Sequence, residues 1–152
     1  MIQRIQTLYL ILAAVALSFI FLAPIASFTG TDGVVYTLNI KDLLGSDGSV
    51  QQAASRISIL ILAPITVLSI GFMILQFKNR QKQMAIGRLI YLMLAALITL
   101  AWFFIEANKF ETQISGYGLG YFAPVAALPF IFLANRSIKK DEELVKSLDR
   151  LR

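Results

Sequence analysis

Residues 57–77 read ISILILAPITVLSIGFMILQF and contain no charged side chain. A helix rises about 1.5 Å per residue, so this stretch is long enough to cross the roughly 30 Å hydrocarbon layer of a bilayer. Its apolar residues follow one another without alternation, which favours a helix over a strand of a membrane barrel. A helix also satisfies its own backbone amides and carbonyls, as lipid requires. This stretch therefore predicts a transmembrane helix.

Three other stretches are similarly long and apolar: residues 5–28, residues 86–105, which contain Arg88 near their start, and residues 117–134. The first is longer than the apolar part of a secretory signal peptide, so we interpret it as a retained membrane anchor. We expect one integral membrane domain over residues 1–152, an all-α up-down-up-down bundle of four transmembrane helices. The remaining parts are a small extracytoplasmic first loop at residues 29–56 and a short cytoplasmic C-terminal helix within residues 135–152.

The composition of the chain supports this class. Of its 152 residues, 57% are hydrophobic and 15% are charged, whereas soluble domains average about 45–50% and 25%. A chain this short cannot bury so much apolar surface in one core, so lipid must cover part of it. The chain has no Cys and no His, and it shows no catalytic motif. We therefore expect a protein that is not an enzyme and has no catalytic residue, cofactor or bound metal.

The distribution of basic residues predicts the orientation. Lys and Arg are enriched in cytoplasmic loops of membrane proteins. Three basic residues fall in the first and third loops: Lys41, Arg56 and Lys109. Eleven fall on the other side: Arg4, Lys78, Arg80, Lys82, Arg88, Arg136, Lys139, Lys140, Lys146, Arg150 and Arg152. We expect a multi-pass protein of the bacterial inner (cytoplasmic) membrane with both termini in the cytoplasm. The net charge of +5 is interpreted as a match to anionic lipid rather than to nucleic acid.

Aromatic residues and glycines mark the outer ends of the last two spans. Outer-interface positions hold the aromatic residues Trp102, Phe103, Phe104, Tyr117, Tyr121 and Phe122, as is common at membrane surfaces. Gly116 and Gly120 have the spacing of small residues that let membrane helices approach closely. We assign that glycine face to helix packing.

Two prolines and one acidic residue are the candidates for a transport path. Pro64 and Pro124 each remove a backbone donor inside a predicted span, and each clashes with the carbonyl four residues earlier. The freed carbonyls of Leu60 and Gly120 then need a partner, such as Thr66, Ser69, water or a neighbouring helix. Glu106 lies at the outer end of the third span. Helix packing also explains the two prolines, and an interfacial cap with solvated charges explains Glu106; we prefer these explanations to a transport path.

The C-terminal tail carries an amphipathic pattern. Leu144, Val145, Leu148 and Leu151 form one apolar stripe on a helix with acidic residues early and basic residues late. Such a stripe suits the membrane surface or a protein partner, and the sequence leaves both open. In the first loop, residues 34–40 are β-prone and lie between turn signals at Asp32-Gly33 and Asp47-Gly48. We expect a strand there that packs on the bundle, on the third loop or on a partner.

Two sequence matches suggest an internal repeat. Residues 9–14 (YLILAA) resemble residues 91–96 (YLMLAA), and residues 63–65 (API) resemble residues 123–125 (APV). Duplication of a helical hairpin is one interpretation. Coincidence in a Leu- and Ala-rich sequence is the other.

The opening string Ile-Gln-Arg-Ile-Gln-Thr-Leu-Tyr at residues 2–9, together with four spans and a short basic tail, resembles an uncharacterised domain-of-unknown-function family. That family consists of small integral membrane proteins found in Bacteroidetes. The resemblance covers nearly the whole chain and implies four membrane helices, but no activity, cofactor or catalytic residue.

These observations give two hypotheses about function. The first is a non-catalytic accessory, scaffold or assembly subunit that contacts the lipid bilayer and binds a protein partner through the tail or the first loop. The second is a small transporter or channel that works as a homo-oligomer, with Pro64, Pro124 and Glu106 near the path. No nucleic-acid partner is expected.

Overall fold

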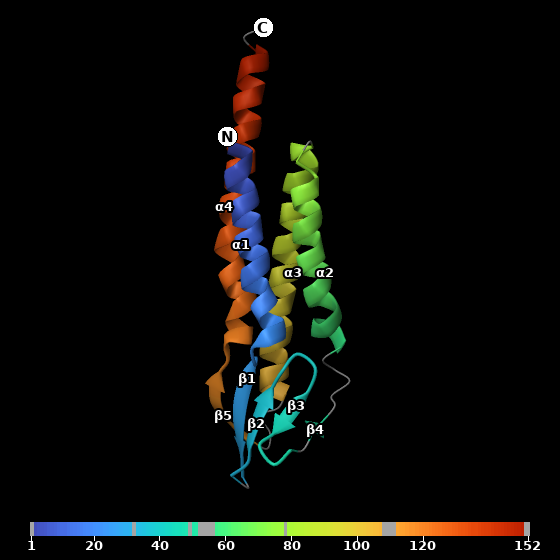
Figure 1. Ribbon diagram of the computed structural model, residues 1–152, viewed down its shortest axis with the longest axis vertical. Helices are drawn as coiled ribbons and strands as arrows, with labels where there is room; N and C mark the ends of the chain where they lie inside the picture. The colour runs from blue at the N-terminus through green and yellow to red at the C-terminus, as the bar shows by residue number, and fades with distance from the viewer. Residues whose placement is uncertain are drawn as a thin grey trace.

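The computed structural model describes residues 2–31, 33–48, 50–51, 57–77, 79–107 and 112–150. Four helices run along the long axis of the molecule, and the strands gather at one end (Figure 1). In chain order the elements are α1 (Ile2–Leu22), β1 (Ala26–Gly30), β2 (Val35–Leu38), β3 (Leu43–Gly45), β4 (Val50–Gln51), α2 (Ile57–Leu75), α3 (Arg80–Ala107), β5 (Thr112–Tyr117) and α4 (Leu119–Arg150). We call the end with the strands the sheet end, and the opposite end the distal end.

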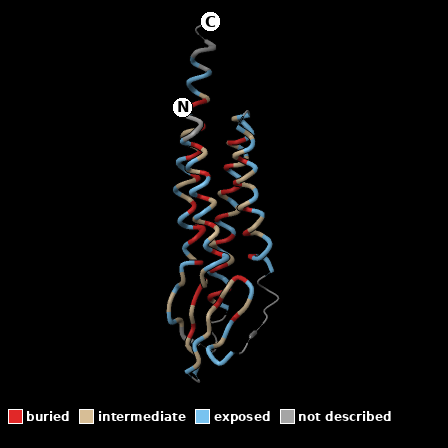
Figure 2. The backbone as a smooth tube through the Cα atoms, in the orientation of Figure 1, coloured by how far each residue is buried: buried red, intermediate tan, exposed pale blue. Residues whose placement is uncertain are grey.

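All four helices are long and apolar enough to cross a membrane, as the sequence predicts. Helix α1 packs on α4 and α2, and α3 packs on the same two helices. Each helix buries one side, which Figure 2 shows as a stripe of buried residues along the bundle. The buried positions recur at alternating spacings of four and three residues, the pattern of helices packed side by side with a slight left-handed twist.

The seam positions are Gln6, Leu10, Ala13, Leu17 and Ile20 in α1; Ile59, Ala63, Thr66, Ile70 and Met73 in α2; Gln83, Gly87, Ile90, Leu94, Leu97, Ala101 and Phe104 in α3; and Pro124, Ala127, Ile131, Ala134, Ile138 and Asp141 in α4.

The outward faces of the helices are also apolar. Large side chains at least about half exposed occur along all four helices, among them Leu8, Val15, Leu68, Phe72, Leu92, Phe103, Leu119 and Phe132. A helix that is apolar all round is either deep in a large core or in contact with lipid. The described part of the chain has four helices to cover one another, which leaves these faces open, and they fit contact with lipid.

The strands form one small antiparallel sheet in the order β4-β3-β2-β1-β5. Strand β1, next to the edge strand, pairs with β2 from the first loop and with β5 from the third loop. The expected strand at residues 34–40 is present as β2, and the third loop contributes to the same sheet. Gly33 and Gly48 lie in turns with positive φ, a conformation that glycine adopts without strain.

Two features of the predicted fold need correction. The all-α class omits the sheet, whose strands come from the end of the first predicted span and from parts of the first and third loops. The first helix ends at Leu22, and residues 26–28 of the predicted span belong to β1. The physical reason is Pro24, which disfavours helical geometry at Ala23 and has no amide hydrogen. The chain then joins the sheet, with the Ile25 amide donating to the Leu38 carbonyl at 2.7 Å.

The predicted C-terminal helix is not separate from the fourth span. Helix α4 continues without a break to Arg150. Residues 130–150 contain neither Pro nor Gly, so nothing in the sequence ends the helix where the apolar run ends. The tail therefore extends in the direction of the bundle, past the start of α1 (Figure 1).

The packing does not support the repeat suggested by residues 9–14 and 91–96. Leu10 is 1% exposed, whereas its counterpart Leu92 is 69% exposed. The buried faces instead align Gln6 with Gln83 and Leu17 with Leu94. Coincidence explains the YLILAA match better than duplication.

Candidate functional site

Buried polar side chains concentrate at the distal end. Among the described residues, the buried polar or charged ones are Gln6, Thr66, Gln83 and Asp141. Thr66 lies within α2 and donates to the Leu62 carbonyl of its own helix at 2.7 Å. The other three lie where α1 begins, where α3 begins and where α4 leaves the bundle.

Asp141 connects three helices. Gln6 of α1 donates a hydrogen bond from Nε2 to Oδ2 of Asp141, and the two residues are 7% and 6% exposed. Arg80 of α3 donates from Nη1 to the Asp141 carbonyl oxygen at 2.8 Å. A buried carboxylate is costly unless it is hydrogen-bonded, and this arrangement supplies a partner for it.

A second pair of contacts fixes the α2–α3 connection at the same end. Gln83 donates from Nε2 to the Met73 carbonyl oxygen at 3.0 Å, which satisfies one of the last carbonyls of α2. The Asn79 Oδ1 atom accepts from the Lys82 amide at 3.1 Å and so caps the start of α3. The distal end is therefore held by side-chain hydrogen bonds in all four helices.

The sequence analysis missed this cluster. Gln6 and Asp141 stand beside charged residues near the two ends of the chain, a context typical of solvated side chains. A signal was nevertheless present. The buried positions of α4 are spaced by three and four residues, at Ile131, Ala134 and Ile138. The same spacing predicts that the next buried position is Asp141.

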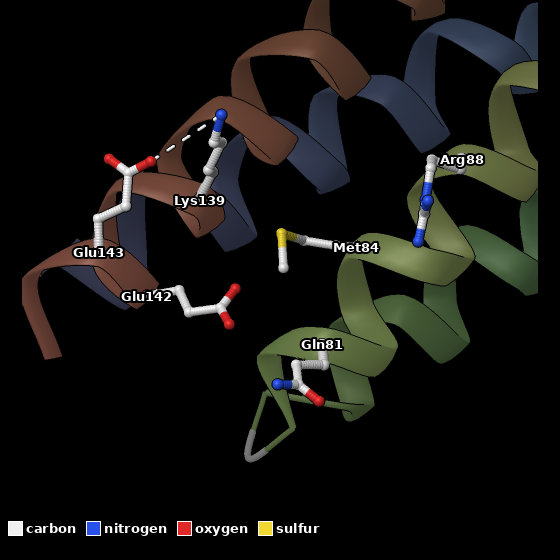
Figure 3. A pocket seen from close by; sticks show the side chains of 6 residues that line it. All are labelled: Gln81, Met84, Arg88, Lys139, Glu142 and Glu143. Carbon is white, nitrogen blue, oxygen red and sulfur yellow. Dashed lines mark ion pairs between the residues drawn. The ribbon is translucent and has the colours of Figure 1, made fainter. Parts of the chain in front are cut away.

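A pocket of about 480 Å³ lies between α3 and α4 at the distal end. Its walls carry both signs of charge, and the close-up in Figure 3 shows Met84 and Glu142 pointing into the space between the two helices. The lining residues are Gln81, Met84 and Arg88 from α3 and Lys139, Glu142 and Glu143 from α4. Lys139 and Glu143 form an ion pair at 3.9 Å, but their side chains are 72% and 65% exposed, so the pair is weak.

The candidate path residues lie on different helices. Pro64 is half-buried in α2, Pro124 is buried in α4, and Glu106 is half-buried in the last turn of α3. The two hydroxyl groups proposed as partners for the Leu60 carbonyl donate to other carbonyls instead. Thr66 donates to Leu62, and Ser69 donates to Ile65 at 2.8 Å. Apart from Thr66, the described seam around these positions is filled by apolar side chains.

The candidate docking residues lie on the part of α4 that extends past α1. Leu144 and Val145 are 54% and 43% exposed. The side chain of Leu148 and the whole of Leu151 lie outside the described residues. The described half of the stripe is therefore uncovered, on a helix that projects from the bundle (Figure 1).

The comparison with protein families gives a match over nearly the whole chain. A family model described as "Domain of unknown function (DUF4293)" matches residues 2–151. The chain belongs to the DUF4293 family. This confirms the resemblance to a domain-of-unknown-function family over nearly the whole chain. No curated protein matches the DUF4293 chain.

At the start of α4 in the DUF4293 chain, Gly118 and Gly120 contact the backbone of residues 23–25. The predicted role of the glycine face was packing against another membrane helix. Gly118 donates from its amide to the Ile25 carbonyl, and Gly120 to the Pro24 carbonyl, both at 2.9 Å. A β-carbon at Gly118 would lie 2.0 Å from the Pro24 carbonyl oxygen, and one at Gly120 would lie 2.5 Å from the Ala23 carbonyl oxygen. These glycines fasten the start of α4 to the link between α1 and β1.

Exposed aromatic side chains of the DUF4293 chain lie near the sheet end, on α3, β5 and α4. Trp102, Phe103, Tyr117 and Phe122 are about half exposed. Phe104 is an exception to the predicted belt, because it is buried in the core. The exposed four have the amphipathic or apolar character found where a membrane meets water.

Proposed function

We propose that this protein is a four-span protein of the bacterial inner membrane that serves as a non-catalytic accessory, scaffold or assembly subunit. Both termini face the cytoplasm, and the projecting end of α4 binds a protein partner. The observation that carries the proposal is the uninterrupted continuation of α4 past the start of α1, with Leu144 and Val145 exposed.

The membrane placement is supported by the surface of the bundle. The outward faces of the helices are apolar, and exposed aromatic side chains lie near the sheet end. The described basic residues of the distal end include Arg80, Lys82, Arg88, Arg136, Lys139 and Lys140. An excess of Lys and Arg favours the cytoplasmic side of a membrane, so this end is the cytoplasmic one. The sheet is then outside the cytoplasm.

The choice of a protein partner over the membrane surface is supported by the direction of α4. A helix that lies on a bilayer runs in the plane of the membrane. Helix α4 instead continues along the bundle. The spacing that places Ile138 and Asp141 against the core continues to Val145 four residues later. The surface that packs on α1 is thus prolonged beyond α1, and a partner helix would continue the same packing.

The same packing supports this role over the alternative of a homo-oligomeric transporter or channel. A path through one chain needs polar side chains at its walls. The described seam is apolar except for Thr66 and the distal-end cluster, and Thr66 bonds within its own helix. The alternative would need a path between copies of the chain.

The test is purification of the full chain from its natural host at native expression, in nanodiscs, read by native mass spectrometry. A double substitution, Leu144→Ser with Val145→Ser, should remove a stoichiometric foreign chain. Point substitutions are preferable to deletion from Asp141 onward, because deletion would also remove the partner of Gln6.

The matched variant is Val35→Ser with Leu44→Ser, which changes similarly exposed residues on the sheet. It should keep the foreign chain bound. Loss in this variant alone would assign docking to the sheet and contradict the proposal. A homo-oligomer without foreign chains, with flux altered by Pro64→Ala, Pro124→Ala or Glu106→Gln, would favour the transporter.

A further inference from the structure

We propose that the pocket between α3 and α4 at the distal end binds the headgroup of a zwitterionic aminophospholipid, namely a phosphoethanolamine group. The proposal rests on the membrane placement proposed above and does not depend on the protein partner. Its first support is size. The pocket measures about 480 Å³, within the range of sites that hold small ligands.

The second support is the charge of the pocket walls. Arg88 and Lys139 provide two cations, and Glu142 and Glu143 provide two carboxylates. The formal charges cancel, so the pocket suits a ligand that itself carries one group of each sign. A phosphate joined through two carbons to an ammonium is such a ligand. The guanidinium of Arg88 suits phosphate oxygens, and carboxylates accept hydrogen bonds from an ammonium.

The third support is the depth of the pocket in the bundle. Arg88 is the last charged residue of α3 before the apolar run from Leu89 to Ile105. On α4, the apolar run ends at Ala134, and Lys139 follows within about a turn and a half. The pocket therefore opens where the apolar belt of the bundle ends. Phospholipid headgroups lie at that level of a bilayer.

The fourth support is an apolar surface beneath the pocket. Residues four or seven apart share one face of a helix. Leu92 is on the face of Arg88, and Phe132 is on the face of Lys139; both are more than half exposed. Acyl chains attached to a headgroup in the pocket would run over these side chains toward the middle of the bundle. A free phosphate ester would make no use of this surface.

The chemistry predicts a specific order of lipid preference. Phosphatidylglycerol offers the phosphate but no ammonium, so the carboxylates of Glu142 and Glu143 would face an anionic headgroup that brings no cationic group. Phosphatidylcholine offers a quaternary ammonium without N–H groups, so it donates no hydrogen bond to the carboxylates. Phosphatidylethanolamine offers both groups. The ion pair of Lys139 with Glu143 is exposed and weak, so its partners are available for exchange with the headgroup.

The experiment uses the full chain in a mild detergent with phosphatidylethanolamine, phosphatidylglycerol or phosphatidylcholine of identical acyl chains, read by native mass spectrometry. Phosphatidylethanolamine should be retained about tenfold more strongly than either other lipid. Arg88→Gln and Glu142→Gln should each abolish this preference. Lys82→Gln and Glu106→Gln, which remove charges outside the pocket, should leave it unchanged.

Three results would overturn the proposal. The first is equal retention of the three lipids. The second is a preference that survives both Arg88→Gln and Glu142→Gln. The third is displacement of the lipid by soluble glycerophosphoethanolamine at equal concentration, which would show that a free phosphate ester suffices. Carbonate extraction of host membranes tests the membrane placement separately, because a protein released into the soluble fraction would refute that placement whatever the lipid result.

Discussion

Gln6 and Asp141 are 135 positions apart in the chain and share a buried hydrogen bond at the distal end of the bundle. Asp141 is the last residue of the α4 seam before the helix projects beyond its neighbours. Arg80 holds the carbonyl of the same residue. The direction in which the projecting end of α4 leaves the bundle is therefore fixed by contacts from α1 and α3.

Removal of the Gln6 side chain tests the stabilising role of this pair. Gln6→Ala should lower the free energy of unfolding by about 1–3 kcal/mol, because the buried Asp141 carboxylate loses its donor. Asp141→Asn should cost less, since its amide oxygen still accepts from Gln6. The measurement is thermal unfolding of the purified protein in a mild detergent.

The control for that prediction is Gln81→Ala, which removes an exposed glutamine at the same end. It should change the free energy of unfolding by no more than about 0.5 kcal/mol. Equal effects of the Gln6 and Gln81 substitutions would show that the buried pair contributes no specific stability.

The close approach at Gly118 gives a second prediction. Gly118→Ala should destabilise the protein by about 1–3 kcal/mol or prevent its folding, because the new β-carbon would press on the Pro24 carbonyl oxygen. Gly116→Ala, two residues earlier in β5, meets nothing within 4 Å and should be nearly neutral. Both variants can be compared by their melting temperatures and by their yield in the membrane fraction. A Gly116 variant less stable than the Gly118 variant would contradict the geometry.

The contact between α3 and α4 gives a third prediction. A β-carbon at Gly87 would lie 2.2 Å from Oδ1 of Asn135, a buried atom without a hydrogen-bond partner among the described residues. Gly87→Ala should destabilise the protein by about 1–3 kcal/mol because the Asn135 side chain must move. Adding Asn135→Ala removes the obstacle. The double variant should therefore be more stable than the sum of the two single effects predicts, with a coupling of about 0.5–3 kcal/mol.

The matched control for that cycle is Gly71→Ala in α2, where a β-carbon meets nothing within 4 Å. It should be neutral or stabilising, because alanine is the better residue in a helix interior. Strict additivity of the Gly87 and Asn135 substitutions would show that the two positions do not interact.

The helices were predictable from the sequence because their signal is strong. A long run without charged residues fits few structures other than a transmembrane helix. Arg88 marks the start of the third run, and Arg136 follows the end of the fourth. The strand β1 was not predicted because its residues, ASFTG, continue directly from an apolar run. Pro24 was the available sign that the helix stops before this strand. Strand β5 was missed because residues 112–117, TQISGY, mix polar residues with a glycine, and only pairing with β1 makes them a strand.

The candidate site was less predictable because it depends on contacts between distant segments. The pocket combines residues from α3 with residues from α4 that read as a solvated charged tail. Only the continuity of α4 brings Lys139 and Glu142 into the same pocket as Arg88. That continuity follows from the absence of a helix-breaking residue after Pro129, a signal that is easily overlooked beside the change from apolar to charged composition.

The pairing of the first and third loops gives a fourth prediction, which also tests the proposed orientation. Thr29 and Gln113 are partners across β1 and β5. Directly opposed residues in an antiparallel pair are close enough for a disulfide. The chain has no Cys of its own, so Thr29→Cys with Gln113→Cys introduces a single pair. This variant should form an intramolecular disulfide in cells, because the proposed orientation puts the sheet in the oxidising compartment outside the cytoplasm.

The readout is the mobility of the protein on a non-reducing gel after thiols are blocked in intact cells. The control combines Thr29→Cys with Ser46→Cys. The Ser46 amide donates to the Val35 carbonyl of β2, so Ser46 lies on the side of β2 away from β1. Strands two apart are separated by about 9–10 Å, beyond the reach of a disulfide, so this pair should stay reduced. A Thr29–Gln113 pair that stays reduced in cells but oxidises after purification would place the sheet in the cytoplasm. A pair that does not oxidise under either condition would contradict the β1–β5 register.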